Sequence, residues 1–246
     1  KKLRSLFTTD RPTPTDAQLN ELEHLIGYRF RDRDMLRLSL THRSIARAAE
    51  QVMPSNERLE FLGDSVLGLV IAHQLYHQHP DLSEGDLTKQ KAMLVNEVTL
   101  SAVAIEIGLN NYIYISLEEE KSGGRERPSI VSDAFESIIG AVYLDGGLAA
   151  ARRLVLDTIY SRKAIILADD AQRNYKGDLL EMMQAKAVGM PRYEIVSETG
   201  PDHDKTFNVI VTVGGEQIGH GAGSSKKEAE QRAAAQALMR MAEDDD

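Results

Sequence analysis

The sequence predicts a multidomain protein, in which an all-α domain is followed by a smaller α+β domain with the element order α-β-β-β-α. The chain has 246 residues, which is enough for two domains of ordinary size. From residue 17 to about residue 167, apolar residues recur at intervals of three and four, the periodicity of helices. Alternation typical of strands begins only after residue 190. We therefore expect an all-α domain over residues 17–167, a polar linker over 168–172 and an α+β domain over 173–242.

Glycine and proline mark the helix ends of the first domain. Gly27, Gly108 and the pair at residues 146–147 each follow an apolar-periodic segment, as is typical of helix C-termini. The segment Lys-Ser-Gly-Gly at residues 121–124 and the nearby Pro128 predict a loop between helices. Strand-like alternation is scarce throughout, so the domain is predicted to be helical.

The second domain is predicted from a change of pattern. A helical stretch over residues 178–187 is followed by three short alternating runs, which read as a meander of strands. The last segment, from residue 225 to about residue 241, is rich in alanine and favours a helix. The three strands are expected at residues 192–196, 207–213 and 217–219.

Composition excludes several classes of protein. The chain has no cysteine, which excludes a disulfide scaffold, a thiol nucleophile and zinc–cysteine or cysteine-held iron–sulfur sites, and which fits a reducing cytosol. The apolar run at residues 66–72 is far shorter than the roughly 20 residues that span a bilayer. The net charge of −9 argues against non-specific coating of nucleic acid, although it leaves room for local basic patches. We expect a cytoplasmic protein that does not contact membranes.

One predicted helix carries three acids on a single face. Glu57, Glu60 and Asp64 stand at positions i, i+3 and i+7, so they lie along one narrow stripe at 3.6 residues per turn. Asp64 is the only charged residue between positions 61 and 72, in an otherwise largely apolar stretch. An unpaired carboxylate buried there would be costly, and a metal ion is a natural partner for it.

A second helix repeats this geometry. Asp133 and Glu136 are three residues apart, and they are the only charges between positions 130 and 140. Two such helices side by side would place four carboxylates around one cavity. Oxygen ligands favour hard cations such as Mg²⁺ or Mn²⁺, which support phosphoryl chemistry. The alternative is that each set of acids belongs to a solvated helix face.

Two other groups of polar residues have ordinary explanations. Glu84 and Asp86 precede a helical run, and their spacing favours helix capping. The histidines at positions 73, 77 and 79 are interpreted as surface or capping residues, because Gln74 stands where a zinc protease motif would need glutamate.

Lys226 and Lys227 stand at the start of the final predicted helix, directly after a segment rich in glycine and serine. The free N–H groups at a helix start can bind an anion, and the two lysines would add positive charge. Lysines at this end oppose the helix dipole, which disfavours a purely structural purpose. The alternative for such a pair, taken alone, is that both are ordinary exposed surface lysines without a binding role.

The acidic segments resemble the ribonuclease III family of double-stranded RNA endonucleases, and the resemblance extends from about Leu19 to Met241. The motifs that carry it occur in the family's order: His42-Arg43-Ser44, Asn56 to Leu67, Glu84-Gly85-Asp86, Lys121-Ser122-Gly123-Gly124, and Asp133 to Gly140. By position, the resemblance implies that Glu60, Asp64, Asp133 and Glu136 bind the catalytic metal, with Asp64 and Glu136 as the foremost catalytic pair. It also implies auxiliary roles for Glu57 at the dimer and substrate surface and for Glu84 at the processing site.

Residues 173–242 resemble a double-stranded RNA-binding domain, which reads the shape of the A-form helix. The resemblance implies that Lys226 and Lys227 contact phosphates, and that Glu181 and the loop containing His203 enter minor grooves.

Together these resemblances imply a homodimeric, Mg²⁺-dependent endoribonuclease, with Mn²⁺ as a substitute metal. It would cut double-stranded RNA to staggered ends with 5′-phosphate and 3′-hydroxyl groups and would mature structured precursors such as rRNA. Two alternatives are a non-catalytic RNA-binding protein and a helical metal-dependent hydrolase of small phosphate substrates. The intact acids argue against the first, and the RNA-binding resemblance argues against the second.

Overall fold

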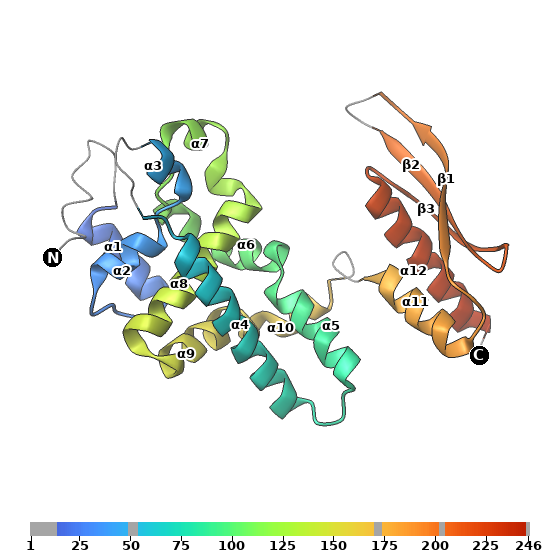
Figure 1. Cartoon of the computed structure of the whole chain (residues 1–246), viewed down its shortest axis with the longest axis horizontal. Helices are drawn as coiled ribbons and strands as arrows, with labels where there is room; N and C mark the ends of the chain where they lie inside the picture. The colour runs from blue at the N-terminus through green and yellow to red at the C-terminus, as the bar shows by residue number, and fades with distance from the viewer. Residues whose placement is uncertain (1–13, 49–53, 170–173, 202–204, 245–246) are drawn as a thin grey trace. The chain divides into compact units, whose positions relative to one another are not determined.

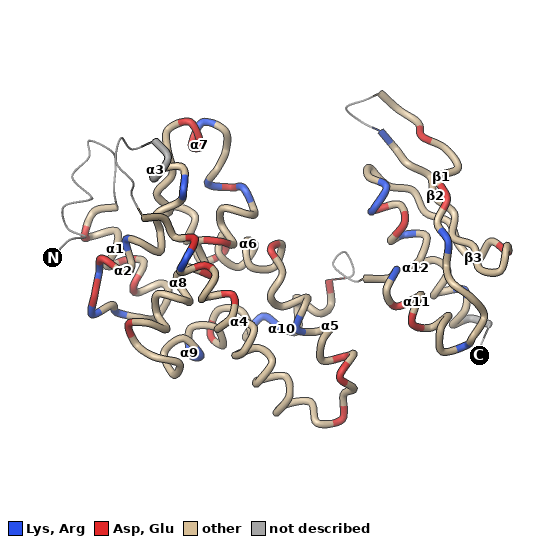
Figure 2. The backbone as a smooth tube through the Cα atoms, in the orientation of Figure 1, with Lys and Arg blue, Asp and Glu red and all other residues tan. Residues whose placement is uncertain are grey.

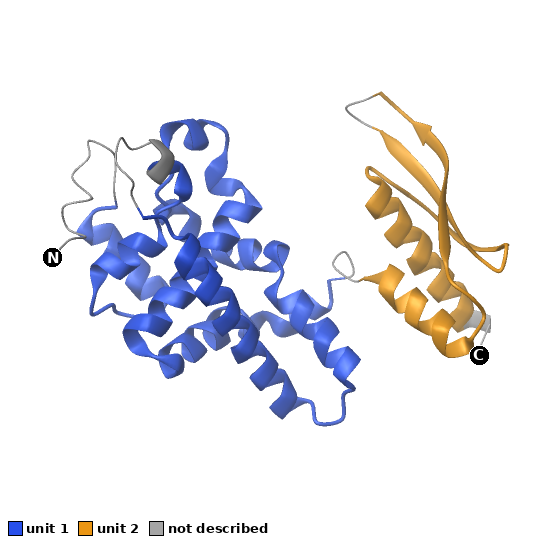
Figure 3. Cartoon of the chain, in the orientation of Figure 1, with its two compact units in different colours: residues 1–170 blue, residues 171–246 orange. Residues whose placement is uncertain are grey.

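The computed structural model describes residues 14–48, 54–169, 174–201 and 205–244 (Figure 1). The chain divides into two compact units, residues 1–170 and 171–246 (Figure 3). No helix among the described residues is both long and apolar enough to cross a membrane.

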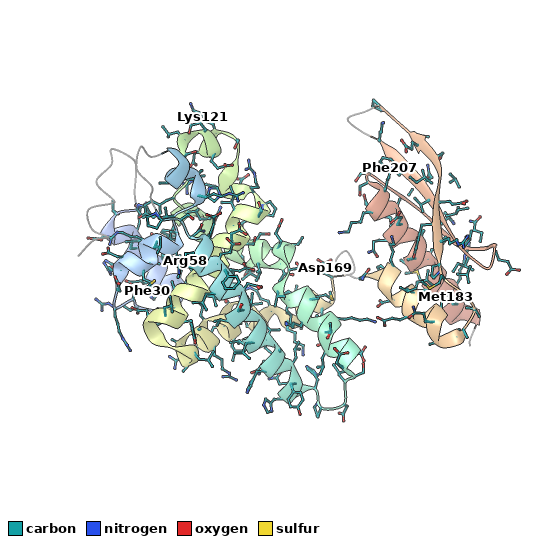
Figure 4. The ribbon with its side chains drawn as sticks, viewed as in Figure 1. Phe30, Arg58, Lys121, Asp169, Met183 and Phe207 are labelled. Atoms are coloured by element: carbon teal, nitrogen blue, oxygen red, sulfur yellow. The ribbon has the colours of Figure 1, made fainter. Side chains whose placement is uncertain are left out.

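The first unit is helical, as predicted. Its α-helices are α1 (Asp16–Leu25), α2 (Arg33–Ser39), α3 (Arg43–Ala48), α4 (Glu57–Gln78), α5 (Glu84–Val95), α6 (Glu97–Glu106), α7 (Leu117–Lys121), α8 (Pro128–Gly146), α9 (Leu148–Thr158) and α10 (Lys163–Leu167). Short 3-10 turns are η1 (Leu109–Tyr112), η2 (Gly124–Glu126) and η3 (Tyr160–Arg162). Lys121 ends α7, and Gly123 follows it with a φ of 78°, so the predicted Lys-Ser-Gly-Gly loop is a turn between α7 and η2 (Figure 4).

The centre of this unit is α8, most of whose residues are buried. Pro128 begins the helix, where its missing N–H has no intrahelical role, and Gly147 ends it with a φ of 80°. Helix α8 packs along α4, and α6 and α9 also pack against it. Phe135, Ile138 and Ile139 are fully buried in the resulting core.

Two glycines let α4 and α8 approach closely. A Cβ atom on Gly63 would lie 1.8 Å from the carbonyl oxygen of Glu136, and one on Gly140 would lie 2.3 Å from that of Leu59. Both distances are far below van der Waals contact, so any larger side chain would push the helices apart. The close contact at these glycines therefore determines which turns of α4 and α8 lie side by side, and so which of their polar side chains meet.

The second unit consists of α11 (Tyr175–Lys186), β1 (Arg192–Thr199), β2 (Thr206–Val213), β3 (Glu216–Gly223) and α12 (Lys226–Asp244). The strands form an antiparallel sheet in the order β1-β2-β3, and both helices lie on one face of it (Figure 1). Its core joins Leu179 and Met183 of α11, Val209 and Val211 of β2, and alanines of α12. Figure 4 labels Met183 and, at the edge of this core, Phe207. The predicted α-β-β-β-α order is confirmed.

Several predicted limits differ from the structure, and the differences at α11 and β3 have clear physical reasons. Helix α11 begins three residues earlier, because the side chain of Asn174 caps it by accepting a 3.2 Å hydrogen bond from the N–H of Gly177. Strand β3 is longer than its turn-like glycines suggest. A Cβ atom on Gly221 would lie 2.3 Å from the backbone nitrogen of Ala233 in α12, so the strand needs glycine where the helix packs directly on it.

Candidate active site

Three carboxylates meet where α4 crosses α8. Glu60 extends from α4, and Asp133 and Glu136 extend from successive turns of α8. Each side chain offers one oxygen within 4.8 Å of those of the other two. All three residues are half-buried, so they line a surface that solvent and substrate can reach. In Figure 2, acidic stretches of the tube gather near the meeting point of α4, α6 and α8.

Hydrogen bonding fixes this meeting point. The hydroxyl group of Ser137 donates a 3.1 Å hydrogen bond to the carbonyl oxygen of Asn56, the residue that precedes α4. The backbone N–H of Asn56 donates in turn to the carbonyl oxygen of Thr41 at 2.8 Å. Ser137 is fully buried and Asn56 nearly so. The first turn of α4 is therefore held against α8 next to the carboxylates.

The electrostatics of the three carboxylates favour a cation. Burial and then the charges of Asp64, Asp133 and Glu60 raise the pKa of Glu136 to about 8. Burial is also the main cause of the raised pKa values of Glu60 and Asp133, and neighbouring acids add to it. Carboxylates that hold their protons this strongly are short of positive charge, and a bound cation would supply it.

Two charged residues beside the carboxylates were missed as site residues. Arg43 lowers the pKa values of Glu60 and Asp133, although burial outweighs it, and its Nη1 lies 3.8 Å from Oε1 of Glu57. Glu97, in the first turn of α6, raises the pKa of Asp133. Arg43 belongs to the His42-Arg43-Ser44 motif, to which no role was assigned, whereas local spacing gives no signal for Glu97 because it reaches the site through packing between distant segments.

Asp64 is exposed, so its carboxylate does not carry the cost that burial on this apolar helix would impose. The core-facing side of α4 is formed by Leu59, Gly63, Val66 and Leu67, and Asp64 lies off that side. It does not join the three-carboxylate group, but its charge raises the pKa of Glu136. Asp64 therefore stands at the open edge of the group.

The auxiliary acids Glu57 and Glu84 are not members of the three-carboxylate group, although the charge of Glu57 adds to the raised pKa values of Glu60 and Asp133. Glu57 is exposed and accepts a 2.7 Å hydrogen bond from the hydroxyl of Ser55, in addition to its approach to Arg43. Glu84 is exposed at the start of α5 and accepts a 3.0 Å hydrogen bond from Thr88. The side chain that caps α5 is Ser83, which accepts from the N–H of Asp86, while Glu84 and Asp86 lie in the first turn, where their charges suit the helix N-terminus.

The histidines near the end of α4 lie at the surface or at the helix C-terminus. His73 and His77 are exposed, with ring centres 4.5 Å apart. His79 is the C-cap residue of the helix, and its Nε2 contacts the amino group of Lys163.

The second unit presents lysines at the start of α12 (Figure 2). Lys226 and Lys227 are exposed in the first turn, where the Ser225 hydroxyl accepts a 3.2 Å hydrogen bond from the N–H of Glu228. The amino group of Lys226 lies 3.9 Å from a carboxylate oxygen of Glu198. Glu181 is exposed on α11, and His203 lies outside the described residues.

Comparisons with known proteins assign both units. Residues 32–163 match the family described as Ribonuclease-III-like, and residues 175–241 match the double-stranded RNA binding motif. The Ribonuclease 3 of Caldanaerobacter subterraneus is 47% identical over 223 residues, which cover 91% of this chain and 98% of that protein. The chain belongs to the ribonuclease III family. The resemblance predicted from its motifs is thereby confirmed.

Other ribonuclease III proteins agree with this assignment. The Ribonuclease 3 of Geobacter metallireducens is 46% identical over 90% of this chain and 91% of that protein. A solved nuclease domain of ribonuclease III from Campylobacter jejuni has 42% identity and a TM-score of 0.55, and it covers 58% of this chain and 96% of that one. As a ribonuclease III, the protein is an endoribonuclease that acts on double-stranded RNA.

Proposed function

We propose that this ribonuclease III hydrolyses double-stranded RNA in a metal-dependent reaction that leaves staggered ends with 5′-phosphate and 3′-hydroxyl groups. The observation that carries the proposal is the convergence of the Glu60, Asp133 and Glu136 carboxylates within 4.8 Å. Maturation of structured precursors such as rRNA, in the cytoplasm, is part of the same proposal and rests on the family resemblance.

The site suits a hard divalent cation. All of its donors are carboxylate oxygens, which favour Mg²⁺ and accept Mn²⁺, and the raised pKa of Glu136 is typical of a site that needs positive charge. Glu60, Asp133 and Glu136 would hold the ion, with Asp64 at the edge. The chemistry supplied by such an ion is activation of water and stabilisation of charge on phosphorus and on the leaving 3′ oxygen.

The residues of the chain itself contribute position and charge. Asp64 and Glu136 form the proposed catalytic pair, and the close helix crossing fixes Glu136 through its backbone contact with Gly63. Rigid placement of this kind lowers the cost of reaching the transition state. Arg43 offers a guanidinium group to an RNA phosphate beside the acids, while Glu57 and Glu84 take auxiliary roles.

In the proposed domain arrangement, residues 17–167 form the nuclease domain, 168–172 the linker and 173–242 the RNA-binding domain. Lys226 and Lys227 would contact phosphates across the major groove, while Glu181 and His203 would lie in minor grooves. The exposure of the two lysines at a capped helix start supports this assignment.

A homodimer is also part of the proposal. Helix α4 exposes a row of large apolar side chains: Phe61 is 78% exposed, Leu69 is 56% exposed and Tyr76 is 68% exposed. Their spacing of eight and seven residues places them on one face of the helix. The solved nuclease domain from Campylobacter jejuni is described as structurally flexible in a region involved in dimer formation. We therefore assign this face to a second copy of the chain.

The direct test is cleavage of a labelled RNA duplex with Mg²⁺ and with EDTA, using single strands of the same sequence as the control. We expect cleavage of the duplex alone, and in Mg²⁺ alone. Binding without cleavage under both conditions would refute the proposal.

The matched variant is Glu136→Gln, which keeps the shape of the side chain and removes its charge. We expect loss of cleavage with retention of duplex binding. Retained cleavage would exclude Glu136 from the catalytic group.

A further inference from the structure

A cavity of about 390 Å³ lies beside the carboxylate group. Asp133 lines the cavity and also belongs to the carboxylate group, so the two are continuous. The other walls include His42, Arg43, Ser44, Ser116 and Arg127. The volume is at the lower end of the range for ligand pockets, which suits part of one nucleotide.

His42 is held rigidly in the wall of this cavity. Its backbone N–H donates to the carbonyl oxygen of Tyr114 at 2.9 Å, and the N–H of Tyr114 donates to Leu40 at 2.8 Å. The side chain is nearly buried, since the residue is 6% exposed. The ring therefore has one fixed position rather than the freedom of a surface histidine.

Hydrogen bonding selects the tautomer of His42. The N–H of Ser44 donates to Nδ1 at 3.2 Å, and the Ser44 hydroxyl lies 2.9 Å from the same atom. That hydroxyl oxygen accepts from the N–H of Ser116 at 2.9 Å, so its own hydrogen points towards Nδ1. Because Nδ1 is an acceptor, the proton of the neutral ring is on Nε2. Among the described residues, Nε2 has no hydrogen-bond partner.

The charges around the ring favour a neutral ligand. Burial lowers the pKa of His42, so the ring is neutral at ordinary pH, even though Glu119 and Glu57 oppose this effect. Two arginines and three acids line the cavity, and Arg127 is paired with Glu119. A net negative wall with a neutral histidine disfavours an additional phosphate and favours a hydroxyl group that can accept one hydrogen bond.

We propose that this cavity binds a ribose 2′-hydroxyl group of the substrate strand next to the scissile phosphate, with Nε2–H of His42 donating to its oxygen. The inference rests on the proposed function, because it needs the scissile phosphate at the carboxylates. The 2′-hydroxyl is the group that distinguishes RNA from DNA at a given site. His42 is then a specificity-determining residue for the ribose.

The test uses the full-length protein and a set of duplexes, each with a single 2′-deoxy nucleotide near the cleavage site. Single-turnover cleavage rates are measured in Mg²⁺ for the wild type, His42→Phe, His42→Gln and the control His24→Phe, which alters an exposed histidine on α1. We expect one 2′-deoxy position to slow the wild type about tenfold, as loss of one hydrogen bond would. In His42→Phe, the all-RNA duplex should be slowed by a similar factor, with no further loss at that position. His42→Gln, which keeps an N–H donor, should retain part of the positional effect.

Three outcomes would overturn the inference. The first is equal slowing of every duplex by His42→Phe with the positional effect intact, since that is the result of a purely structural role. The second is a wild type that no single 2′-deoxy substitution slows. The third is a His42-dependent effect of a methylphosphonate substitution without any 2′-deoxy effect, since this would assign the residue to a phosphate. If the wild type does not cleave the all-RNA duplex in Mg²⁺, the proposed function itself fails, and the two failures are thereby distinguished.

Discussion

At the scale of single residues, the surroundings of Glu136 disfavour the ionised form of its carboxyl group when no cation is bound. Its folded-state pKa of about 8 lies above the ordinary glutamate value of 4.5, because of burial and three neighbouring acids. A raised pKa means that the folded state binds the proton more tightly than the unfolded state does. The stabilisation from protonated Glu136 is therefore complete below about pH 4.5 and is lost as the pH rises to about 8.

Glu136→Gln should remove this dependence. In EDTA, we expect the midpoint of thermal unfolding of the variant to exceed that of the wild type by about 2–4 °C near pH 8, as about 1 kcal/mol of relieved repulsion would produce in a chain of this size. The difference should disappear near pH 4.5, and Mg²⁺ at pH 8 should stabilise the wild type more than the variant. Parallel curves of midpoint against pH for the two proteins would contradict the electrostatic interpretation.

The surroundings of Asp145 favour its ionised form, in contrast to those of Glu136. Although burial opposes ionisation, hydrogen bonds from Tyr28 and from the N–H groups of Arg31 and Asp32 lower its pKa. These bonds measure 2.6, 2.9 and 3.0 Å and connect the end of α8 to the segment before α2. The stability that they provide is present above the unfolded-state pKa and is lost as the pH falls through the lower folded-state value.

Asp145→Asn should therefore destabilise the protein by about 1–3 kcal/mol at neutral pH, because the amide presents N–H donors to groups that are donors themselves. Denaturant unfolding measures this difference, and we expect it to shrink in acid. The control is Asp157→Asn on the exposed side of α9, which should be neutral. Equal stability of the two variants at pH 7 would show that the three hydrogen bonds contribute little.

At the scale of helices and strands, the crossing of α4 and α8 determines whether the carboxylates can meet. Gly63→Ala and Gly140→Ala would each place a Cβ atom inside the backbone of the facing helix. We expect each to cost about 1–3 kcal/mol or more by overpacking, and to reduce cleavage further than the loss of stability explains, because the helices would separate at the site.

Gly68→Ala is the matched control for these variants. It lies in the same helix as Gly63, and its Cβ atom would meet only the end of the Lys91 side chain at 3.5 Å. Alanine is favoured over glycine within a helix by about 1 kcal/mol, so this variant should be as stable as the wild type or more so, with normal cleavage. Activity in Gly63→Ala equal to that of Gly68→Ala would refute the role of the close crossing.

The exposed row on α4 makes a further prediction at this scale. The double variant Phe61→Lys, Leu69→Lys should weaken dimerisation at least 100-fold, as the loss of two apolar anchors would. Analytical ultracentrifugation across a concentration series measures the effect. Ile165→Lys, which alters a 76% exposed residue on α10, is the control. A monomeric wild type, or an unchanged dimer in the double variant, would refute the assignment of this face.

Local pattern predicted the elements well, but it did not predict how they meet. The helical periodicity correctly grouped Asp133 with Glu136, since both belong to one face of one helix. It could not separate Asp64 from Glu60, because exposure depends on which side of α4 packs against α8. The contributions of Arg43 and Glu97 arise from segments far apart in the chain, and no spacing rule connects them. The prediction made strand β3 too short, because its glycines allow close packing against α12 and do not form turns.

At the scale of the whole molecule, a net charge of −9 coexists with binding to a polyanion. Salt screens charges that are more than about 8–10 Å apart at physiological ionic strength. Affinity should therefore depend on the residues in contact with the phosphates rather than on the sum over the chain. An adaptation to high salt is the alternative explanation for the acidic composition, and function that peaks at low salt would count against it.

Lys227→Ala tests which charges matter to RNA binding. If Lys227 contacts a phosphate, its removal should weaken binding to any duplex sequence and should reduce the slope of log affinity against log salt by about 1. Arg240→Ala is the control, because it removes the same charge from an exposed position about 20 Å further along α12. We expect it to leave the slope unchanged when affinities are measured from about 50 to 200 mM salt. Equal loss of slope in both variants would show that the net charge governs binding, and that the start of α12 has no special part in it.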